Sequence, residues 1–191
     1  RPDSDSAFQL LGEVYSDMQE YAKAAEAYRR AAELDPEDIE IKKAEAQALF
    51  LSDKLDESAK LYDEIAKAEP DDGLALLRLG QIYRREMKYD RARQNLLKAA
   101  QAIPDSVEVQ FNIVLLDRDE GHLEDALKLA NDLLKKTAKA NGRYTEAVKQ
   151  NRRIFLINQG ILNQTLGNYN EAVRTFEEVK SLTNEKDGRM D

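Results

Sequence analysis

Three prolines at a fixed interval constrain the fold of this chain more than any other feature of its sequence. Pro36, Pro70 and Pro104 stand 34 residues apart, and each opens a short segment that contains aspartate. Proline cannot continue a helix, and it disfavours the helical conformation in the residue before it. Asp38 and Asp72 then lie where an N-cap would open the next helix. The pattern predicts a helix end and a new helix start in every repeat.

Small and aromatic residues recur with the same step. The small residues 34 positions apart are Ala24, Ser58, Ala92 and Ala126. Two steps separate Leu11-Gly12 from Leu79-Gly80 and Tyr15 from Tyr83, and one step separates Tyr28 from Tyr62. The small residues would let the two helices of a repeat approach closely, while tyrosines and leucines fill the space around them. One repeat cannot bury both helix faces, so neighbouring repeats must stack.

This combination resembles the tetratricopeptide repeat. That repeat has a Leu-Gly pair and a tyrosine in its first helix, then a small residue and an aromatic residue in its second helix, then a proline. The resemblance covers nearly the whole chain and rests on several positions that agree in phase. It implies an all-α fold, in which antiparallel helix pairs form a right-handed superhelical solenoid.

We therefore expect a single solenoid over residues 1–191. Its five repeats are expected at 5–38, 39–72, 73–106, 107–140 and 141–186. The fourth is degenerate, because the pattern's glycine, tyrosine and proline are replaced by Val114, Asp117 and Ala138. The chain opens without an initiator methionine, so we also expect it to be a piece of a longer protein.

The pattern of the fifth repeat lies 12 residues further along the chain than the 34-residue period predicts, and its start allows two interpretations. Asn141-Gly142 predicts a helix stop, and residues 143–166 would then form one long first helix that ends at Gly167-Asn168. Alternatively, residues 142–148 copy the turn at 167–173 and add half a repeat. Helix-length preferences favour the long helix.

Composition and charge narrow the classes of partner and chemistry. The formal net charge is −8, so phosphate backbones would repel the chain and nucleic acid is not expected as a partner. The chain has no cysteine, which excludes disulfides, thiolate metal sites and a cysteine nucleophile. Its sequence contains no run of 18 apolar residues, so we expect a soluble protein without a membrane span. The sequence is compatible with either the cytoplasm or the bacterial periplasm as the compartment of this protein.

Residues that could carry catalysis or hold a metal are sparse. The only histidine, His122, lies in a predicted turn and lacks partners for a nucleophile pair or a histidine metal site. Residues 117–121 resemble a calcium loop only faintly, because Gly121 falls one place early. We therefore expect no catalytic residues, no metal, no cofactor and no enzymatic activity.

The resemblance also implies where a partner would bind. In this family the first helix of each repeat lines the concave surface, and fixed positions of that helix point inward. On this sequence those positions carry basic side chains, amide side chains and a strip of apolar side chains. The candidate partner-binding residues are Lys43, Gln47, Leu77, Arg78, Gln81, Arg84, Arg85, Phe111, Asn112, Leu115 and Asn158. Arginine suits carboxylates and amides suit a peptide backbone, so we predict an acidic ligand.

Each of these residues also has a plainer interpretation. The apolar ones would be core residues, and the arginines would be solvated or paired with Glu108 and Asp119. The two-carboxylate clamp with which co-chaperones of this family hold chaperone tails is absent. Only Arg78 matches that clamp over repeats one to three, and only Lys43 over repeats two to four. An adaptor for chaperone tails is therefore not expected.

The sequence thus favours a protein–protein interaction scaffold that holds an extended or helical acidic segment across repeats two to five. The alternative is a structural or assembly module that stacks through uncapped ends, with a second copy or within a longer superhelix. Solenoids usually end in a polar capping helix, whereas Phe176 and Val179 would leave an apolar face on the last helix. This alternative predicts a homo-oligomer formed through the C-terminal end.

Overall fold

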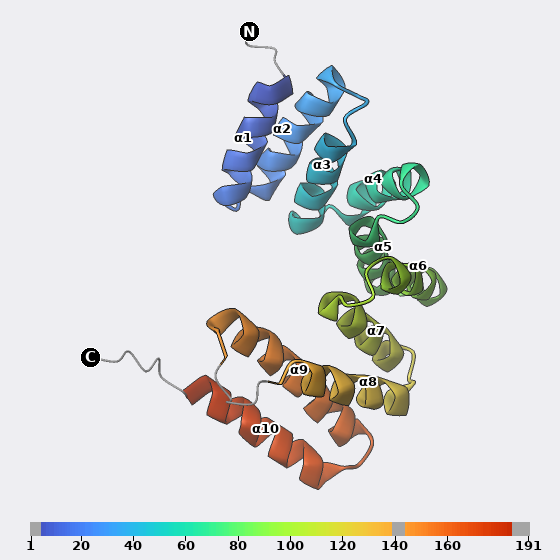
Figure 1. The fold of residues 1–191 in the computed structure, drawn as a ribbon, viewed down its shortest axis with the longest axis vertical. Coiled ribbons are helices and arrows are strands. Elements are labelled where there is room, and N and C mark those ends of the chain that lie inside the picture. Colours follow the sequence, from blue (N-terminus) through green and yellow to red (C-terminus); the bar gives the residue numbers. More distant parts are fainter. Residues whose placement is uncertain (1–4, 139–143, 185–191) are drawn as a thin grey trace, which may run out of the picture. The chain divides into compact units, whose positions relative to one another are not determined.

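The structure, a computed structural model, describes residues 5–138 and 144–184. Within these ranges the regular secondary structure is entirely helical, which confirms the expected all-α fold (Figure 1). The helices are α1 (Asp5–Asp17), α2 (Tyr21–Leu34), α3 (Ile39–Leu51), α4 (Leu55–Ala68), α5 (Gly73–Arg85), α6 (Tyr89–Ala102), α7 (Val107–Asp119), α8 (Leu123–Lys136), α9 (Glu146–Thr165) and α10 (Tyr169–Asn184). In the part of the chain that is described, no helix is long and apolar enough to cross a membrane.

The chain divides into two compact units, Arg1–Pro104 with α1 to α6 and Asp105–Asp191 with α7 to α10. Consecutive helices pack against each other within each unit, so α2 contacts α1 and α3, and α9 contacts α8 and α10. The first helices of four successive pairs begin 34 residues apart, at Asp5, Ile39, Gly73 and Val107. Within a unit, the first helix of a pair therefore covers the second helix of the pair before it.

Short polar side chains open these first helices. The carboxylate of Asp38 accepts a hydrogen bond from the backbone N–H of Glu40 at 2.9 Å. Asp72 accepts one from the N–H of Ala75 at 2.8 Å, and Ser106 caps α7 in the same way. Each cap satisfies a backbone donor that has no partner inside the helix. The acidic residues that follow the prolines thus determine where the next helix starts.

The turn inside each helix pair contains one residue with a left-handed backbone. These residues are Gln19, Asp53, Met87, Gly121 and Gly167, with φ values between 58° and 84°. The first four stand 34 residues apart, so the turn geometry repeats with the sequence. A glycine adopts this conformation without the steric cost that a Cβ atom brings.

Small residues let the two helices of a pair approach closely. A Cβ built on Gly80 of α5 would lie 2.6 Å from Cγ of Leu96 in α6. Gly12 faces the ring of Tyr28 in the same way, at 2.6 Å from the built Cβ. A large side chain on the second helix therefore fills the space that the glycine leaves open.

Gly80→Ala is expected to lower the free energy of unfolding by about 1–3 kcal/mol, because the added methyl overpacks against Leu96. In a helix without this contact, alanine would instead be more stable than glycine by roughly 0.5–1 kcal/mol. Ala46 occupies the equivalent position of α3, and Ala46→Gly is the matched control, with an expected loss of about 1 kcal/mol. Urea unfolding followed by circular dichroism measures both changes. A Gly80→Ala variant more stable than wild type would contradict the close packing.

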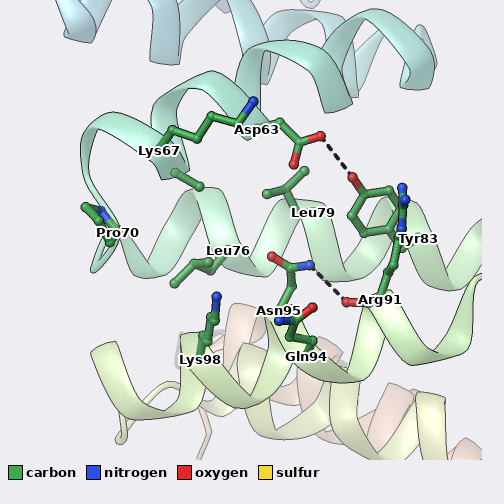
Figure 2. Close-up of a pocket in the computed structure, with 11 residues that line it drawn as sticks. Asp63, Lys67, Pro70, Leu76, Leu79, Tyr83, Arg91, Gln94, Asn95 and Lys98 are labelled. Carbon is green, nitrogen blue, oxygen red and sulfur yellow. Dashed lines mark hydrogen bonds between the residues drawn. The ribbon is translucent and has the colours of Figure 1, made fainter.

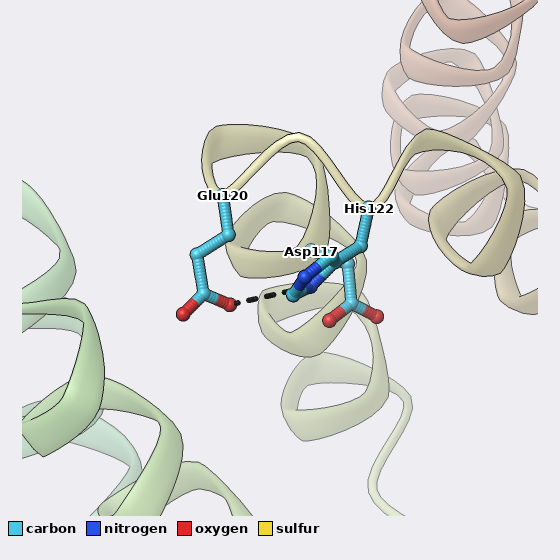
Figure 3. A group of neighbouring side chains, drawn as sticks. All are labelled: Asp117, Glu120 and His122. Atoms are coloured by element: carbon cyan, nitrogen blue, oxygen red, sulfur yellow. Dashed lines mark ion pairs between the residues drawn. The ribbon is translucent and has the colours of Figure 1, made fainter.

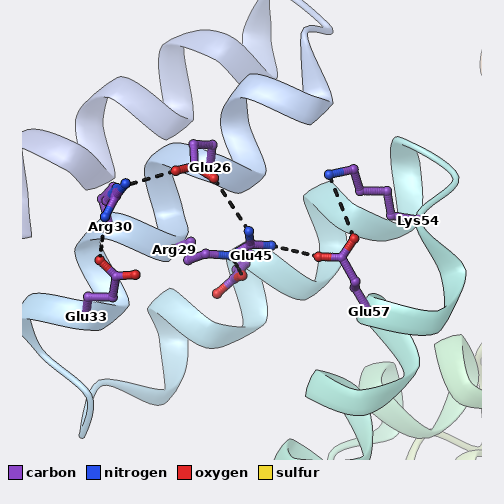
Figure 4. A network of polar contacts seen from close by, with 7 residues as sticks. All are labelled: Glu26, Arg29, Arg30, Glu33, Glu45, Lys54 and Glu57. Atoms are coloured by element: carbon purple, nitrogen blue, oxygen red, sulfur yellow. Dashed lines mark hydrogen bonds and ion pairs between the residues drawn. The ribbon is translucent and has the colours of Figure 1, made fainter.

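A network of charges joins α2, α3 and α4 in the first unit (Figure 4). Arg29 of α2 donates from Nε to Glu45 of α3 at 3.0 Å and pairs through Nη2 with Glu57 of α4 at 2.9 Å. The Glu45 side chain is only 8% exposed. Burial raises the pKa of Glu45, although its hydrogen bond with Arg29 opposes the shift. One buried carboxylate therefore lies at the junction of two helix pairs.

The first helix of the last pair is longer than the others. α9 contains 20 residues, whereas α1, α3, α5 and α7 contain 13 each. It is a single helix from Glu146 onward. The predicted start at residue 143 and the predicted helix stop at Asn141-Gly142 lie outside the described residues. Leu162 of α9 is fully buried and packs with Ala130 of α8, which holds α9 on α8.

Candidate functional site

An oriented arginine lies at the centre of the candidate site in the first unit. Arg78 of α5 donates from Nε to Oε1 of Gln47 in α3 at 3.0 Å, and from Nη1 to Oε1 of Gln81 at 2.8 Å. Its guanidinium lies over the Phe50 ring, 5.1 Å from the ring centroid. The two amides are neutral acceptors, and together they fix the plane of the guanidinium.

A buried tyrosine holds Gln47 in turn. The hydroxyl of Tyr62 in α4 donates to the same Oε1 atom of Gln47 at 3.0 Å. Burial raises the pKa of Tyr62, so its phenol stays a neutral donor. The sequence singled out Gln47 and Arg78 but not Tyr62, because Tyr62 belongs to the second helix of its pair. Its recurrence one step after Tyr28 was the signal that could have drawn attention to it.

Lys43 is surrounded by carboxylates of the chain itself. Its Nζ lies 3.0 Å from Glu40, 2.6 Å from Glu69 and 2.9 Å from Asp72. The hydrogen bonds to Glu69 and Asp72 raise the pKa of Lys43. Burial favours a higher pKa for Asp72, but hydrogen bonds from the Ala75 N–H and from Lys43 outweigh it and lower that pKa. A carboxylate of a ligand would therefore compete at Lys43 with three carboxylates of the chain.

The other basic residues of α5 differ in their surroundings. Arg85 forms an ion pair with Asp53 at 2.6 Å, in which both side chains are exposed, while Arg84 is half-buried. An exposed pair of this kind contributes only about 0–1 kcal/mol. Leu77 is 1% exposed, so the structure corrects its assignment as a ligand contact and places it in the core. One helical turn before Arg78, Leu74 is exposed on the same side of α5.

The second unit contains the remaining candidate residues. Phe111 of α7 lies against Phe155 of α9 with ring centroids 4.7 Å apart, and it packs on the core of this unit. Leu115 is half-buried. Asn112 is buried and donates from Nδ2 to the backbone carbonyl of Glu108 at 2.8 Å, so its assignment as a ligand contact is also corrected. Phe111 is half-buried on this core, and its role as a ligand contact stays a prediction.

Asn158 belongs to a polar contact between α7 and α9. Its Oδ1 accepts a hydrogen bond from Nη1 of Arg118 at 2.5 Å. Arg118 also forms an ion pair with Asp119 at 2.9 Å. Next to Asn158, α9 exposes a stripe of isoleucines on neighbouring turns, Ile154, Ile157 and Ile161. The second unit thus presents an apolar stripe with an arginine–amide pair at its side.

A cavity of about 380 Å³ lies elsewhere in the first unit, between α4, α5 and α6 (Figure 2). The hydroxyl of Tyr83 in α5 donates to Asp63 of α4 at 3.0 Å. Burial raises the pKa of Tyr83, and its hydrogen bond to Asp63 adds to the shift. Arg91 of α6 lies over the Tyr83 ring, 5.5 Å from its centroid. These three side chains join one helix pair to the next.

Three side chains at one turn of the second unit could approach a cation. One ligand atom each from Asp117, Glu120 and His122 lies within 4.8 Å of the others (Figure 3). The Nδ1 atom of His122 is 3.8 Å from the Glu120 carboxylate, and the histidine is mostly exposed, as expected for a surface turn. Acidic groups around an exposed histidine are common on surfaces without a metal, so we assign no metal site to this turn.

Comparison with known families agrees with the geometry of the helix pairs. Two family models described as tetratricopeptide repeat match the chain, one over residues 6–38 and one over residues 43–107. Together they cover just over half of it. The chain belongs to the tetratricopeptide repeat family. Repeats of this family generally form scaffolds rather than enzymes, so this tetratricopeptide repeat protein is a protein–protein interaction scaffold.

The chain is also similar to curated proteins and to solved structures. The chain is similar to protein O-mannosyl-transferase TMTC1 of Homo sapiens, with 30% identity over 122 residues. That match covers 62% of this chain and only 14% of the human protein. Among solved structures, MamA from Desulfovibrio magneticus RS-1 has a TM-score of 0.80 at 15% identity, covering 97% of this chain and 98% of that one. YrrB, described as a TPR protein with an unusual peptide-binding site, has a TM-score of 0.67 at 14% identity, covering 97% and 89%. At these identities the two structures show a shared tetratricopeptide fold and nothing about ligands.

Proposed function

We propose that this scaffold binds an acidic peptide segment on the face formed by α3 and α5, with Arg78 as its anchor. The observation that carries the proposal is the fixed guanidinium of Arg78, held by two amides and stacked on Phe50. Arginine binds a carboxylate through two parallel N–H groups, and a guanidinium already held in place loses less freedom on binding. An acidic side chain of the ligand is therefore the natural partner of this residue.

Apolar side chains near the anchor favour a ligand that combines acidic and aliphatic residues. Leu74 lies one helical turn before Arg78 and is exposed, and Phe50 is half-buried beneath the guanidinium. Complete burial of one leucine contributes roughly 1.5–3 kcal/mol. Lys43 and Arg85 each already pair with carboxylates of the chain.

Arg78→Ala is expected to weaken binding of an acidic peptide by about 10–100-fold, because a charge-assisted hydrogen bond contributes about 1.5–3 kcal/mol. The probe is an array of synthetic peptides that combine glutamate or aspartate with leucine, next to matched peptides that carry glutamine or asparagine instead. Fluorescence anisotropy of the strongest binder then gives the dissociation constant.

Arg85→Gln is the matched control, because Arg85 is a basic residue of the same helix with a carboxylate partner already in place. We expect this variant to bind within about threefold of wild type, since an exposed pair contributes little. Circular dichroism checks that both variants keep their helices. Equal binding of the acidic and amide peptides would contradict the proposal, as would equal losses in both variants.

A further inference from the structure

We propose that the cavity between α4, α5 and α6 binds a small polyanion, that is, a compact molecule with two or more carboxylate or phosphate charges. The ligand would lie between basic side chains of α4 and α6, against buried leucines of α5. This inference is independent of the proposed peptide site, because the cavity is lined by other side chains than those that hold Arg78.

The size of the cavity suits a small molecule. Its volume of about 380 Å³ lies at the lower end of the range of about 300–1,000 Å³ that is usual for small-molecule sites. Leu76 and Leu79 line it from α5 and are 3% and 1% exposed. Lys67 of α4 and Lys98 of α6 lie on opposite sides of these leucines (Figure 2). A compact ligand in the cavity could therefore approach cations from two helices.

The side chains around the cavity carry an excess of positive charge. Its cations are Lys67, Arg91 and Lys98, while its acidic side chain, Asp63, accepts a hydrogen bond from Tyr83. Among the described residues, neither Lys67 nor Lys98 forms an ion pair. The whole chain has a formal net charge of −8, so this positive charge is a local feature. A cleft lined by charges of one sign concentrates ligands of the opposite sign, and here it selects an anion.

One step of 34 residues earlier, the chain itself neutralises the charges at these positions (Figure 4). There, Arg29 lies 3.0 Å from the buried Glu45 and 2.9 Å from Glu57. The equivalent positions in the cavity are Asp63, Leu79 and Arg91. The cavity thus has an apolar residue where the earlier step has its buried carboxylate.

The three cations of the cavity stand at positions that are not basic in the neighbouring steps. Glutamate occupies all of them one step earlier, as Glu33, Glu57 and Glu64. One step later the same positions carry Gln101, Asp125 and Asp132. Of these three steps, only the one that forms the cavity is basic at every position. A joint change of sign at three positions that line one cavity points to a ligand rather than to solubility alone.

The chemistry of the cations favours a ligand with more than one anionic group. The ammonium groups of Lys67 and Lys98 are compact charges with three donors each, which suit phosphate and carboxylate oxygens alike. Arg91 adds a planar set of donors and lies over the Tyr83 ring, 5.5 Å from its centroid. A polyanion can contact several of these groups at once, whereas an ion with a single charge satisfies fewer of them.

Nuclear magnetic resonance titration of the isotope-labelled chain tests the site with two probes, citrate as a polycarboxylate and inorganic pyrophosphate as a polyphosphate. We expect the largest changes at Lys67, Arg91 and Lys98 with at least one probe, and smaller changes with acetate at the same concentration. The probe that binds more tightly distinguishes a carboxylate ligand from a phosphate ligand. No change at these three residues with either probe would overturn the proposal, as would changes there only with the acidic peptides.

A pair of double variants separates the site from the overall charge of the chain. Lys67→Gln with Lys98→Gln is expected to weaken binding of the tighter probe by about tenfold or more, measured by isothermal titration calorimetry. Lys42→Gln with Lys60→Gln is the matched control, because it removes the same charge from the equivalent positions one step earlier. This control and Arg78→Ala should bind the probe within about threefold of wild type. Equal losses in the two double variants would overturn the proposal.

Discussion

Arg29→Leu is expected to lower the free energy of unfolding by about 3 kcal/mol at neutral pH, because it leaves the Glu45 carboxylate buried without its partner. The Nε atom of Arg29 lies 3.0 Å from Glu45, whose side chain is 8% exposed. We place the effect at the lower end of the usual range for a broken buried pair, since Arg29 itself is partly exposed. Urea unfolding followed by circular dichroism measures the change.

Glu45→Leu is the control that distinguishes the loss of the ion pair from the removal of the buried carboxylate. Leucine stands at the equivalent position in two other first helices, as Leu11 and Leu79. Replacing a buried ion pair by apolar residues is often neutral or stabilising. We therefore expect Glu45→Leu to stay within about 1 kcal/mol of wild type or to exceed it, and Arg29→Leu with Glu45→Leu to recover most of the loss. A loss in Glu45→Leu equal to that in Arg29→Leu would contradict this account.

The pH dependence of the same variants provides a further check. Burial raises the pKa of Glu45 in the folded chain above its unfolded value, which is about 4.3 for glutamate. Its contribution to stability is therefore greatest below the unfolded pKa and is lost as the pH rises through the folded pKa. Arg29→Leu removes a partner that lowers this pKa, so its deficit relative to wild type should shrink as the solution is acidified. Glu45→Leu should lack this dependence.

Leu162→Ala is expected to cost about 2–5 kcal/mol, which is the usual range for truncating a fully buried leucine. Leu162 is 0% exposed and joins α9 to the buried cluster of α7 and α8 in the second unit. The neighbouring Ile161 is exposed, so Ile161→Ala is the matched control, with an expected loss below about 1 kcal/mol. Equal losses in the two variants, measured by urea unfolding, would contradict the packing of α9 on α8.

The fold could be predicted from the sequence because each repeat carries its own start and stop signals. The prolines, the capping residues Asp38, Asp72 and Ser106, and the glycines under large side chains all repeat with one period. The last pair was harder, since the period fails after residue 138. There, Gly160 and Phe176 still indicated a helix pair. In the structure, Gly160 of α9 faces the ring of Phe176 in α10.

The candidate site could be predicted only in part, because its contacts join different helices. Positions on α3 and α5 identified Gln47 and Arg78 correctly as neighbours of a shared face. They could not show that Glu69 and Asp72, from the end of one pair and the start of the next, surround Lys43. The acidic segment around Pro70 was the available signal. For Leu77, the choice between core and groove depends on how neighbouring helices cross, which a single helix pattern does not specify.

Chemical-shift mapping tests the proposed role of the α3 and α5 face most directly. The isotope-labelled chain is titrated with the strongest acidic, leucine-containing peptide from the array, and amide and side-chain signals are followed. We expect the largest changes at Gln47, Arg78 and Gln81. Changes confined to the cavity between α4, α5 and α6, near Lys67, Arg91 and Lys98, would contradict the account and move the peptide site to that cavity.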